Sequence, residues 1–337
     1  MKKYNFLEIL LFSLFFLACK SETAEFQSKQ LNILRKIDLQ QNFGGFTIDQ
    51  SVNKYCDHYI IFDRANQNVL LVDLNFSKVF QEFDLKNTLL ESAPLYGFDI
   101  LENKLFLRTS SGFAVYNLDN NQLIGTFKNP FPLSNHLLRF KGKNFATVVS
   151  ESSVTVVNFL WDDEKGFVDI KEVVAVPTKR LTIDVDLSGW LFGLKNSLAY
   201  IDDWSGEYTL LDIDRKEIIK QGRLPLGGPL EENYEIDESN IYSGNYKNAY
   251  SLTQLDDSSF FILREVDWEI STATEIDLSL ESDKMRIRKR VHLFDQDFEI
   301  IRSFQLENFA TSIFYDNGKL IVNHSGDEEF YVYEILD

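Results

Sequence analysis

Short apolar runs separated by polar turns follow one another along this chain, and one arrangement of them recurs. The stretch His58 to Leu85 predicts three short strands, and within it Leu71-Val72-Asp73-Leu74 precedes the next apolar run at Val79. Similar strings are Val115-Tyr116-Asn117-Leu118, Leu210-Leu211-Asp212-Ile213 and Leu293-Phe294-Asp295. A recurrence of short strands and hairpin turns is typical of a repeat architecture and predicts a β-propeller.

The pattern divides into six modules. Each module opens with a short strand, near Phe46, Leu95, Leu137, Ile183, Ala249 and Thr311. Second strands are expected at Tyr59, Leu105, Phe145, Ser197, Phe260 and Lys319, and third strands at Asn68, Phe113, Ser153, Tyr208, Arg290 and Phe330. Fourth strands follow only in the first five modules, at Val79, Leu123, Phe167, Ile218 and Ile300.

One predicted strand near the start of the chain, Ile33 to Leu39, has no partner in this pattern. A propeller can close its ring when the N-terminal strand completes the last blade, because closure removes the open sheet edges. We therefore expect an all-β, six-bladed β-propeller over residues 33–337, in one domain, with Ile33 to Leu39 as the outer strand of the last blade.

The first eighteen residues have the anatomy of a signal peptide, with a basic start, an apolar run from Ile9 to Ala18, and Cys19 directly after it. The apolar run is shorter than the roughly 20 residues that a membrane-spanning helix needs. FLAC resembles the lipobox of bacterial lipoproteins, in which the Cys is acylated; the alternative is an ordinary secretory signal ending near a Cys. Residues 19–32 would then tether the fold to the membrane. Cys56 has no disulfide partner, and we expect a small buried residue there.

The formal net charge is −18, and the charge is dispersed along the chain. This charge argues against nucleic acid and anionic lipid surfaces as ligands, because both would be repelled. Cations, basic proteins and neutral glycans remain as ligand classes. The simplest interpretation of the charge is a solvated acidic surface.

Catalytic sequence motifs are absent, and the four histidines have no metal-ligand spacing. The string from Asp184 to Gly189 resembles the start of a calcium loop, but Lys195 stands where a bidentate Glu is needed, so a hairpin turn is favoured. A metal-dependent hydrolase remains an alternative. It would hold Ca²⁺ in the central channel with carboxylates from the opening strands, and the candidate ligands are Asp49, Asp99, Asp184 and Asp316.

Two long insertions interrupt the fifth module, at Leu226 to Lys247 and at Glu265 to Ile287. In a propeller both connections emerge on the same face, where we expect a lobe beside the channel mouth. The candidate binding residues are aromatic and acidic, namely Asp202, Trp204, Tyr234, Tyr242, Tyr246, Glu265 and Trp268. Alternatively, these aromatic side chains pack the small core of the lobe itself.

The FLAC start, the FDRANQNVLLVDL hairpin and FFILRE followed by HLFDQDFEII together resemble the uncharacterised six-bladed, TolB-like β-propeller lipoproteins of Gram-negative envelopes. The resemblance implies acylation of Cys19 and, because Lys20 is not Asp, an outer-membrane or cell-surface location. It carries no catalytic residues. The expected function is a non-catalytic, monomeric, lipid-anchored module without a cofactor, which binds an envelope protein or glycan; the alternative is a lactonase-like hydrolase.

Overall fold

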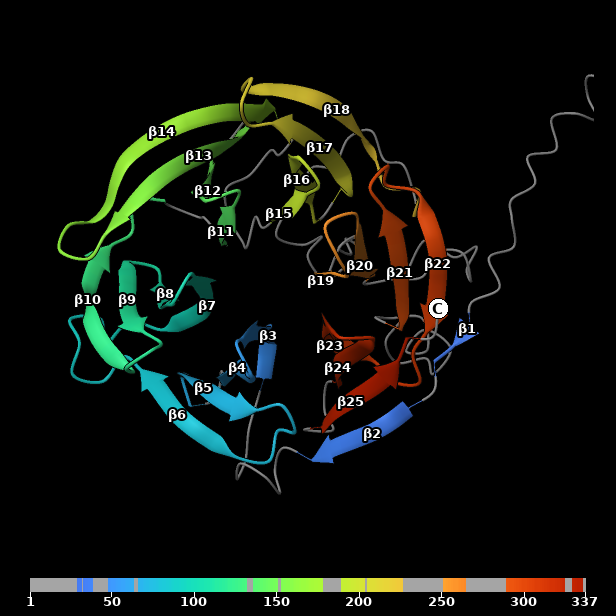
Figure 1. Ribbon diagram of the computed structural model, residues 1–337, viewed down its shortest axis with the longest axis horizontal. Coiled ribbons are helices and arrows are strands. Elements are labelled where there is room, and N and C mark those ends of the chain that lie inside the picture. Colours follow the sequence, from blue (N-terminus) through green and yellow to red (C-terminus); the bar gives the residue numbers. More distant parts are fainter. Residues whose placement is uncertain are drawn as a thin grey trace, which may run out of the picture.

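The structure is a computed structural model of the 337-residue chain. It describes residues 29–31, 33–38, 48–63, 66–131, 136–150, 153–177, 189–203, 205–226, 251–264, 289–324 and 329–335. These residues form six β-sheets arranged as blades around a central axis, with no helix among them (Figure 1). The predicted all-β, six-bladed architecture is confirmed.

The blades follow the chain in order, and each runs from an inner strand at the axis to an outer strand (Figure 1). Blade 1 contains β3 (Ile48–Tyr55), β4 (His58–Asp63), β5 (Asn68–Asp73) and β6 (Val79–Asp84). Blade 2 contains β7 (Leu95–Leu101), β8 (Lys104–Thr109), β9 (Gly112–Asn117) and β10 (Gln122–Lys128). Blade 3 contains β11 (Leu137–Phe140), β12 (Lys143–Val149), β13 (Ser153–Asp162) and β14 (Gly166–Pro177).

The remaining blades repeat this antiparallel arrangement. Blade 4 contains β15 (Gly189–Leu194), β16 (Ser197–Asp202), β17 (Glu207–Asp212) and β18 (Glu217–Arg223). Blade 5 contains β19 (Ser251–Gln254), β20 (Ser259–Leu263), β21 (Arg290–Asp295) and β22 (Ile300–Gln305), with β1 (Lys29–Gln30) beside β22. Blade 6 contains β23 (Ala310–Asp316), β24 (Lys319–His324) and β25 (Glu329–Glu334), with β2 (Ile33–Asp38) beside β25.

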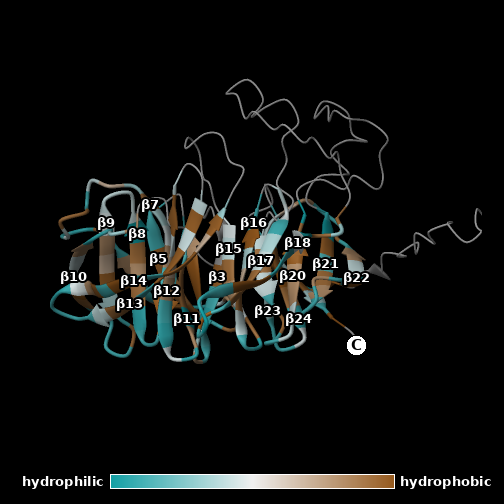
Figure 2. Ribbon diagram, turned by 90° about the horizontal axis from the view of Figure 1, so that it is seen from above, coloured by the Kyte–Doolittle hydropathy of each residue, from teal (hydrophilic) through white to brown (hydrophobic). Residues whose placement is uncertain are grey.

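The hydrophobic core lies between the blades. The second and third strands of the blades are largely buried, with β13 the most exposed of them, and all five residues of β20 are buried. Six clusters of buried apolar side chains occur, and each is shared by two neighbouring blades. Figure 2 accordingly shows largely hydrophobic strand interiors and hydrophilic short turns along one rim. Burial of these continuous apolar faces holds neighbouring blades together.

The recurring acid or amide seen in the sequence ends the third strand and accepts hydrogen bonds from the turn that follows. The Asp73 carboxylate accepts from the backbone N–H of Ser77 at 2.6 Å and of Lys78 at 2.7 Å. Asn117, Asp162, Asp212 and Asp295 do the same in blades 2 to 5, each accepting from two backbone N–H groups. The repeat therefore reflects a backbone requirement of the turn.

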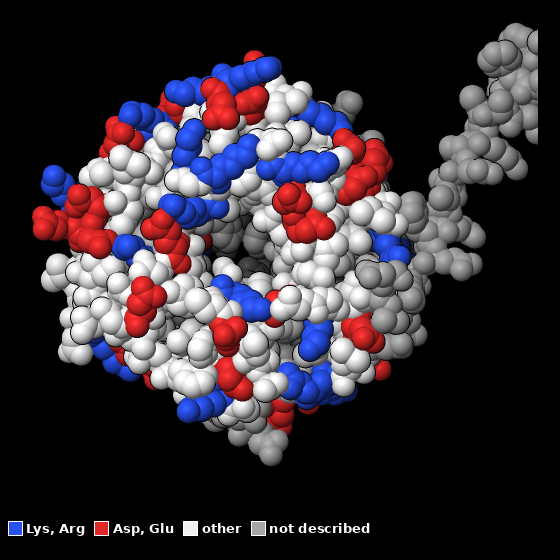
Figure 3. Space-filling view, in the orientation of Figure 1, with Lys and Arg blue, Asp and Glu red and all other residues white. Residues whose placement is uncertain are grey.

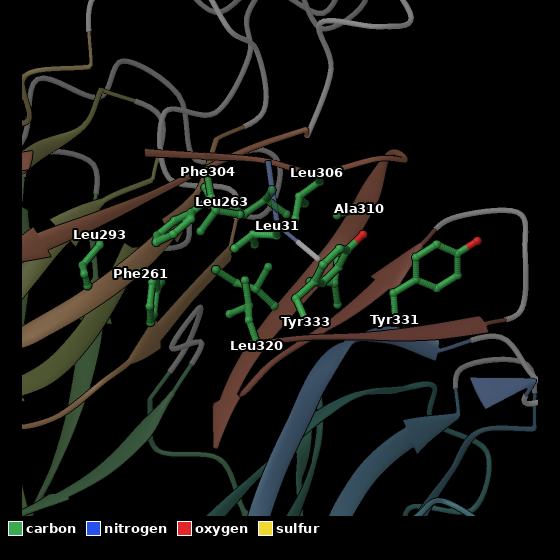
Figure 4. Close-up of a cluster of buried hydrophobic side chains, with 13 residues drawn as sticks. Leu31, Phe261, Leu263, Leu293, Phe304, Leu306, Ala310, Leu320, Tyr331 and Tyr333 are labelled. Atoms are coloured by element: carbon green, nitrogen blue, oxygen red, sulfur yellow. The ribbon is translucent and has the colours of Figure 1, made fainter. Parts of the chain in front are cut away.

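The N-terminal strands contact the last two blades. β2 pairs antiparallel with β25, with Ile37 opposite Phe330, and β1 pairs parallel with β22. Between them Leu31 is 8% exposed and packs in the cluster shared by blades 5 and 6, near Phe304 and Tyr333 (Figure 4). Residues 29–31, which the sequence interpretation assigned to the tether, thus contact the propeller.

Cys56 differs from its expected environment. Its side chain is exposed, whereas we predicted a buried position. The residue occupies the tight turn between β3 and β4 with a φ of +51°. A turn tip has no neighbouring layer to cover it, so the alternation of the adjacent strands does not extend to this residue.

Candidate functional site

Most of the predicted binding residues lie outside the described part of the chain. These are Trp204, Tyr234, Tyr242, Tyr246, Glu265 and Trp268. Asp202 is described, and it ends β16 with a side chain that is only 7% exposed. Its Oδ1 accepts a hydrogen bond from the Ser205 N–H at 2.9 Å, so this carboxylate stabilises the turn after β16.

The alternative metal ligands are divided in the same way. Asp184 and the side chain of Asp49 lie outside the described residues. Asp316 lies 2.7 Å from Lys54 Nζ, and Asp99 lies 3.6 Å from His136 Nδ1 and 3.9 Å from Arg108 Nη1. The two described carboxylates thus contact different cationic groups. Across the described ranges, no three His, Cys, Asp or Glu side chains are grouped as metal ligands would be.

Asp99 begins a chain of contacts along the inner wall. It is 5% exposed on β7, and its partner His136 precedes β11. The His136 ring stacks on Trp190 of β15, with ring centroids 5.0 Å apart and planes inclined by 19°. These contacts join the inner edges of blades 2, 3 and 4. Their evident role is to link neighbouring blades around the axis.

A cavity of about 720 Å³ lies between blades 2 and 3, and we call it the 2/3 groove. Blade 2 contributes residues around the β7–β8 turn, and blade 3 contributes the β11–β12 turn and the tip of the β13–β14 hairpin. The lining residues are Glu102, Lys104, Arg139, Gly142, Lys143, Asn144, Asn158, Phe159, Leu160, Trp161, Asp162, Asp163 and Glu164.

The groove exists because one hairpin is unusually long. β13 has 10 residues and β14 has 12, whereas the strands of blades 1 and 2 have six to eight. The hairpin tip extends toward blade 2 (Figure 1), where the Trp161 ring lies 4.7 Å from Phe106 and 4.8 Å from Phe127, centroid to centroid. Gly166, with a φ of +80°, allows the close approach, because a Cβ there would lie 2.6 Å from the Phe127 ring.

Four of the charged groups of the groove form two ion pairs with one another. Arg139 Nη2 lies 2.6 Å from Glu102 Oε1 and links the two blades, and Lys104 Nζ lies 3.6 Å from Asp163 Oδ1. Asp163 also accepts a hydrogen bond from Trp161 Nε1 at 2.6 Å, which orients the indole. The groove walls therefore present paired charges of both signs, with Lys104 and Arg139 on strands β8 and β11 and their acidic partners in adjoining turns.

Two further features shape the groove. Leu160 is 59% exposed beside Trp161 and adds an apolar surface. The backbone N–H groups of Lys165 and Glu164 hold the pKa of Asp162 below its usual value, so this carboxylate is ionised at neutral pH.

Figure 3 shows one face of the ring, on which Lys and Arg side chains form an arc over the part occupied by blades 3 and 4. Basic groups thus gather locally in a chain whose net charge is −18.

Sequence reasoning did not identify the groove residues. The available signal was the length of two β-rich runs, 153–162 and 166–177, separated by only three residues. A hairpin whose strands are longer than those of the neighbouring blades must project beyond its own blade. The contact of Trp161 with Phe106 joins residues of different modules, so no local pattern indicates it.

Comparisons with known proteins support the fold. No family model matches the chain, and no curated protein matches its sequence. A streptogramin B lyase structure is similar with a TM-score of 0.53 and 8% identity, covering 89% of this chain and 97% of that one. Virginiamycin B lyase from Staphylococcus aureus matches with a TM-score of 0.51 and 8% identity, covering 90% and 99%. BamB from Moraxella catarrhalis matches with a TM-score of 0.46 and 11% identity, covering 86% and 83%. At 8% identity the likeness to the two lyases concerns the propeller fold alone.

Proposed function

We propose that this protein is a non-catalytic binding module of a Gram-negative cell envelope, and that its ligand, a protein segment or a glycan, occupies the 2/3 groove. The observation that carries the proposal is the groove itself. Its volume of about 720 Å³ lies within the range of roughly 300–1,000 Å³ that ligand sites have. Most of its lining groups lie on strands of two neighbouring blades, and groups on strands are held more precisely than groups on loops.

The chemistry of the lining favours a ligand with polar groups and at least one apolar group. Leu160 supplies an exposed apolar contact, and Asn144 and Asn158 supply amides. The Arg139–Glu102 pair can hydrogen-bond a ligand from either side without leaving a buried charge unpaired, because both side chains are over one-third exposed. Such a site recognises shape and hydrogen-bonding groups rather than net charge.

Binding is favoured over metal-dependent hydrolysis by the environment of the described candidate ligands. Asp316 is held by Lys54 and by the hydroxyl of Tyr59, and Asp99 is flanked by His136 and Arg108. A divalent cation at either carboxylate would have to compete with a cationic group already in place. The hydrolase alternative therefore has less support in the described residues than the binding module.

The envelope location rests on the N-terminal sequence. We propose that Cys19 is acylated, that the ring is closed by β2 in blade 6, and that β1 fastens the chain against blade 5. Two cysteines occur in the chain, which provides a matched control. In cells fed an alkyne-tagged fatty acid, Cys19→Ala should lose the label and leave the membrane fraction, whereas Cys56→Ala should keep both. Equal labelling of both variants would contradict lipidation at Cys19.

The groove is tested by binding. The purified chain is screened against an array of bacterial envelope oligosaccharides and a displayed random-peptide library. Binding of any selected probe should fall at least about tenfold in Leu160→Glu, because a charge then replaces the exposed apolar contact. Ile219→Glu is the control, since Ile219 is 51% exposed on β18 of blade 4, outside the groove lining. Equal loss in both variants, or in neither, would place the binding surface elsewhere.

A further inference from the structure

We infer that the anchored propeller presents its 2/3 groove on the side of the ring farthest from the membrane, so that the groove takes a ligand from the aqueous compartment. The inference rests on the proposed acylation of Cys19. Its structural basis is the position of the N-terminal strands relative to the groove. β1 pairs with the outer strand of blade 5, and β2 pairs with β25 of blade 6.

The two positions lie opposite each other on the ring. The groove lies between blades 2 and 3, and the chain reaches the propeller at the boundary of blades 5 and 6. In a ring of six blades, three blades separate these boundaries in either direction. Figure 1 shows this arrangement, with β1 on one side of the ring and the β13–β14 hairpin on the other.

The attachment point is fixed to the propeller. Leu31 is buried in the cluster shared by blades 5 and 6, and β1 and β2 on either side of it are hydrogen-bonded into the two sheets. A membrane anchor at the N-terminus is therefore connected to the propeller at this edge of the ring. Figure 4 shows Leu31 among the side chains of the cluster, close to Leu306 and Tyr333.

The chain between the anchor and the attachment point is short. Ten peptide units separate Cys19 from Lys29, and they span at most about 35 Å even when fully extended. The edge formed by blades 5 and 6 therefore stays close to the membrane. The groove lies on the opposite side of the ring, where the tether does not hold it near the membrane and a soluble protein segment or glycan can reach it.

The orientation can be measured by energy transfer to the membrane. In a Cys56→Ser background, a donor dye is attached at Leu34→Cys on β2 or at Glu164→Cys at the hairpin tip; both residues are exposed. The acylated protein is bound to phosphatidylethanolamine–phosphatidylglycerol vesicles that carry a lipid-linked acceptor. We expect at least about twofold stronger quenching at position 34 than at position 164, since the tether limits the distance from the membrane only for the edge formed by blades 5 and 6. Equal quenching, or stronger quenching at 164, would overturn the inference.

A second measurement uses a bulky probe. With biotin in place of the dye, streptavidin should bind position 164 equally fast on vesicles and in solution, and position 34 severalfold more slowly on vesicles. Slowing at position 164 would count against an open groove.

The experiments distinguish a failure of the proposed anchor from a failure of the inferred orientation. Failure of the full chain to join vesicles would refute the lipid anchor alone. A hexahistidine tag placed before Lys20, on vesicles containing a nickel-chelating lipid, then reproduces the attachment point and decides the orientation with the same two measurements.

Discussion

Lys54 and Asp316 join the first blade to the last. Lys54 Nζ on β3 lies 2.7 Å from Asp316 Oδ1 at the end of β23, and the hydroxyl of Tyr59 donates to Asp316 Oδ2 at 2.7 Å. The side chains of Lys54 and Asp316 are 27% and 14% exposed. The sequence-based alternative made Asp316 a metal ligand, but its described contacts are those of a link across the seam of the ring.

Replacing Asp316 should weaken that seam. We expect Asp316→Asn to lower the free energy of unfolding by about 1–3 kcal/mol, because the charge opposite Lys54 is lost and only one of the two acceptor oxygens remains. Urea denaturation followed by circular dichroism measures the change. Asp214→Asn is the matched control, since the Lys143–Asp214 pair is 50% and 72% exposed and should contribute under about 1 kcal/mol. Equal losses would show that the Lys54–Asp316 pair contributes no more to the free energy of unfolding than an exposed ion pair does.

The pairing of β2 with β25 predicts a contrast between two residues of the same strand. Ile37 is 4% exposed in the cluster shared by blades 6 and 1, whereas Leu34 is 49% exposed. Ile37→Ala should cost about 2–4 kcal/mol, and Leu34→Ala less than about 1 kcal/mol. Thermal and urea unfolding of the two variants provide the comparison. A negligible effect of Ile37→Ala would mean that β2 is not needed to close the ring.

His292 predicts a loss of stability in acid. Burial, together with the nearby Arg264 and Arg290 guanidinium groups, holds the pKa of His292 well below its usual value. The unfolded chain therefore binds a proton near pH 6.5 that the folded chain does not bind. Stability is present above that pH and is lost as the pH falls, by about 1 kcal/mol between pH 7.5 and 5.5.

The test compares urea unfolding at the two pH values. In His292→Gln the acid-dependent loss should be smaller than in the parent by about 1 kcal/mol. The amide of Gln can still reach Ser303, whose hydroxyl lies 2.8 Å from His292 Nδ1. An unchanged pH dependence would show that protonation of His292 does not limit acid stability.

Removing one of the carboxylates that accept hydrogen bonds from a turn should lower the free energy of unfolding. Asp73→Ala deletes the acceptor for the backbone N–H groups of Ser77 and Lys78 and for the Ser77 hydroxyl, at 2.6–2.8 Å. We expect a loss of about 1–2 kcal/mol in the free energy of unfolding. Asp57→Ala, in the exposed β3–β4 turn, is the control and should change stability by less than about 0.5 kcal/mol. Comparable losses would argue against a specific capping role for Asp73.

The parts of the fold that sequence reasoning predicted are those specified within one module. Asp73, Asn117, Asp212 and Asp295 each act on the next few backbone groups, so their spacing is visible in the sequence and locates the turns. Buried second and third strands likewise appear as apolar runs because both of their faces are covered.

The candidate site depends on contacts between modules, which no local pattern indicates. Trp161 reads as one aromatic residue of a strand, yet it packs on Phe106 and Phe127 of the neighbouring blade. Asp202 reads as an acidic turn residue, yet it is buried. Whether a polar side chain faces solvent or a neighbouring blade is set by the ring geometry rather than by its own segment.

The pairing of β2 with β25 also has consequences for how the chain folds. The first four blades can each form from strands that are consecutive in sequence. The pairing of Ile37 with Phe330, in contrast, joins two residues that are separated by almost the whole chain. Formation of the β2–β25 pair therefore carries the largest loop entropy and should come late. Until it occurs, the edge of β25, with the sequence EFYVYE, can pair with another strand. A second copy's β2 is such a strand, so exchange of this segment between chains is the expected route of misassembly.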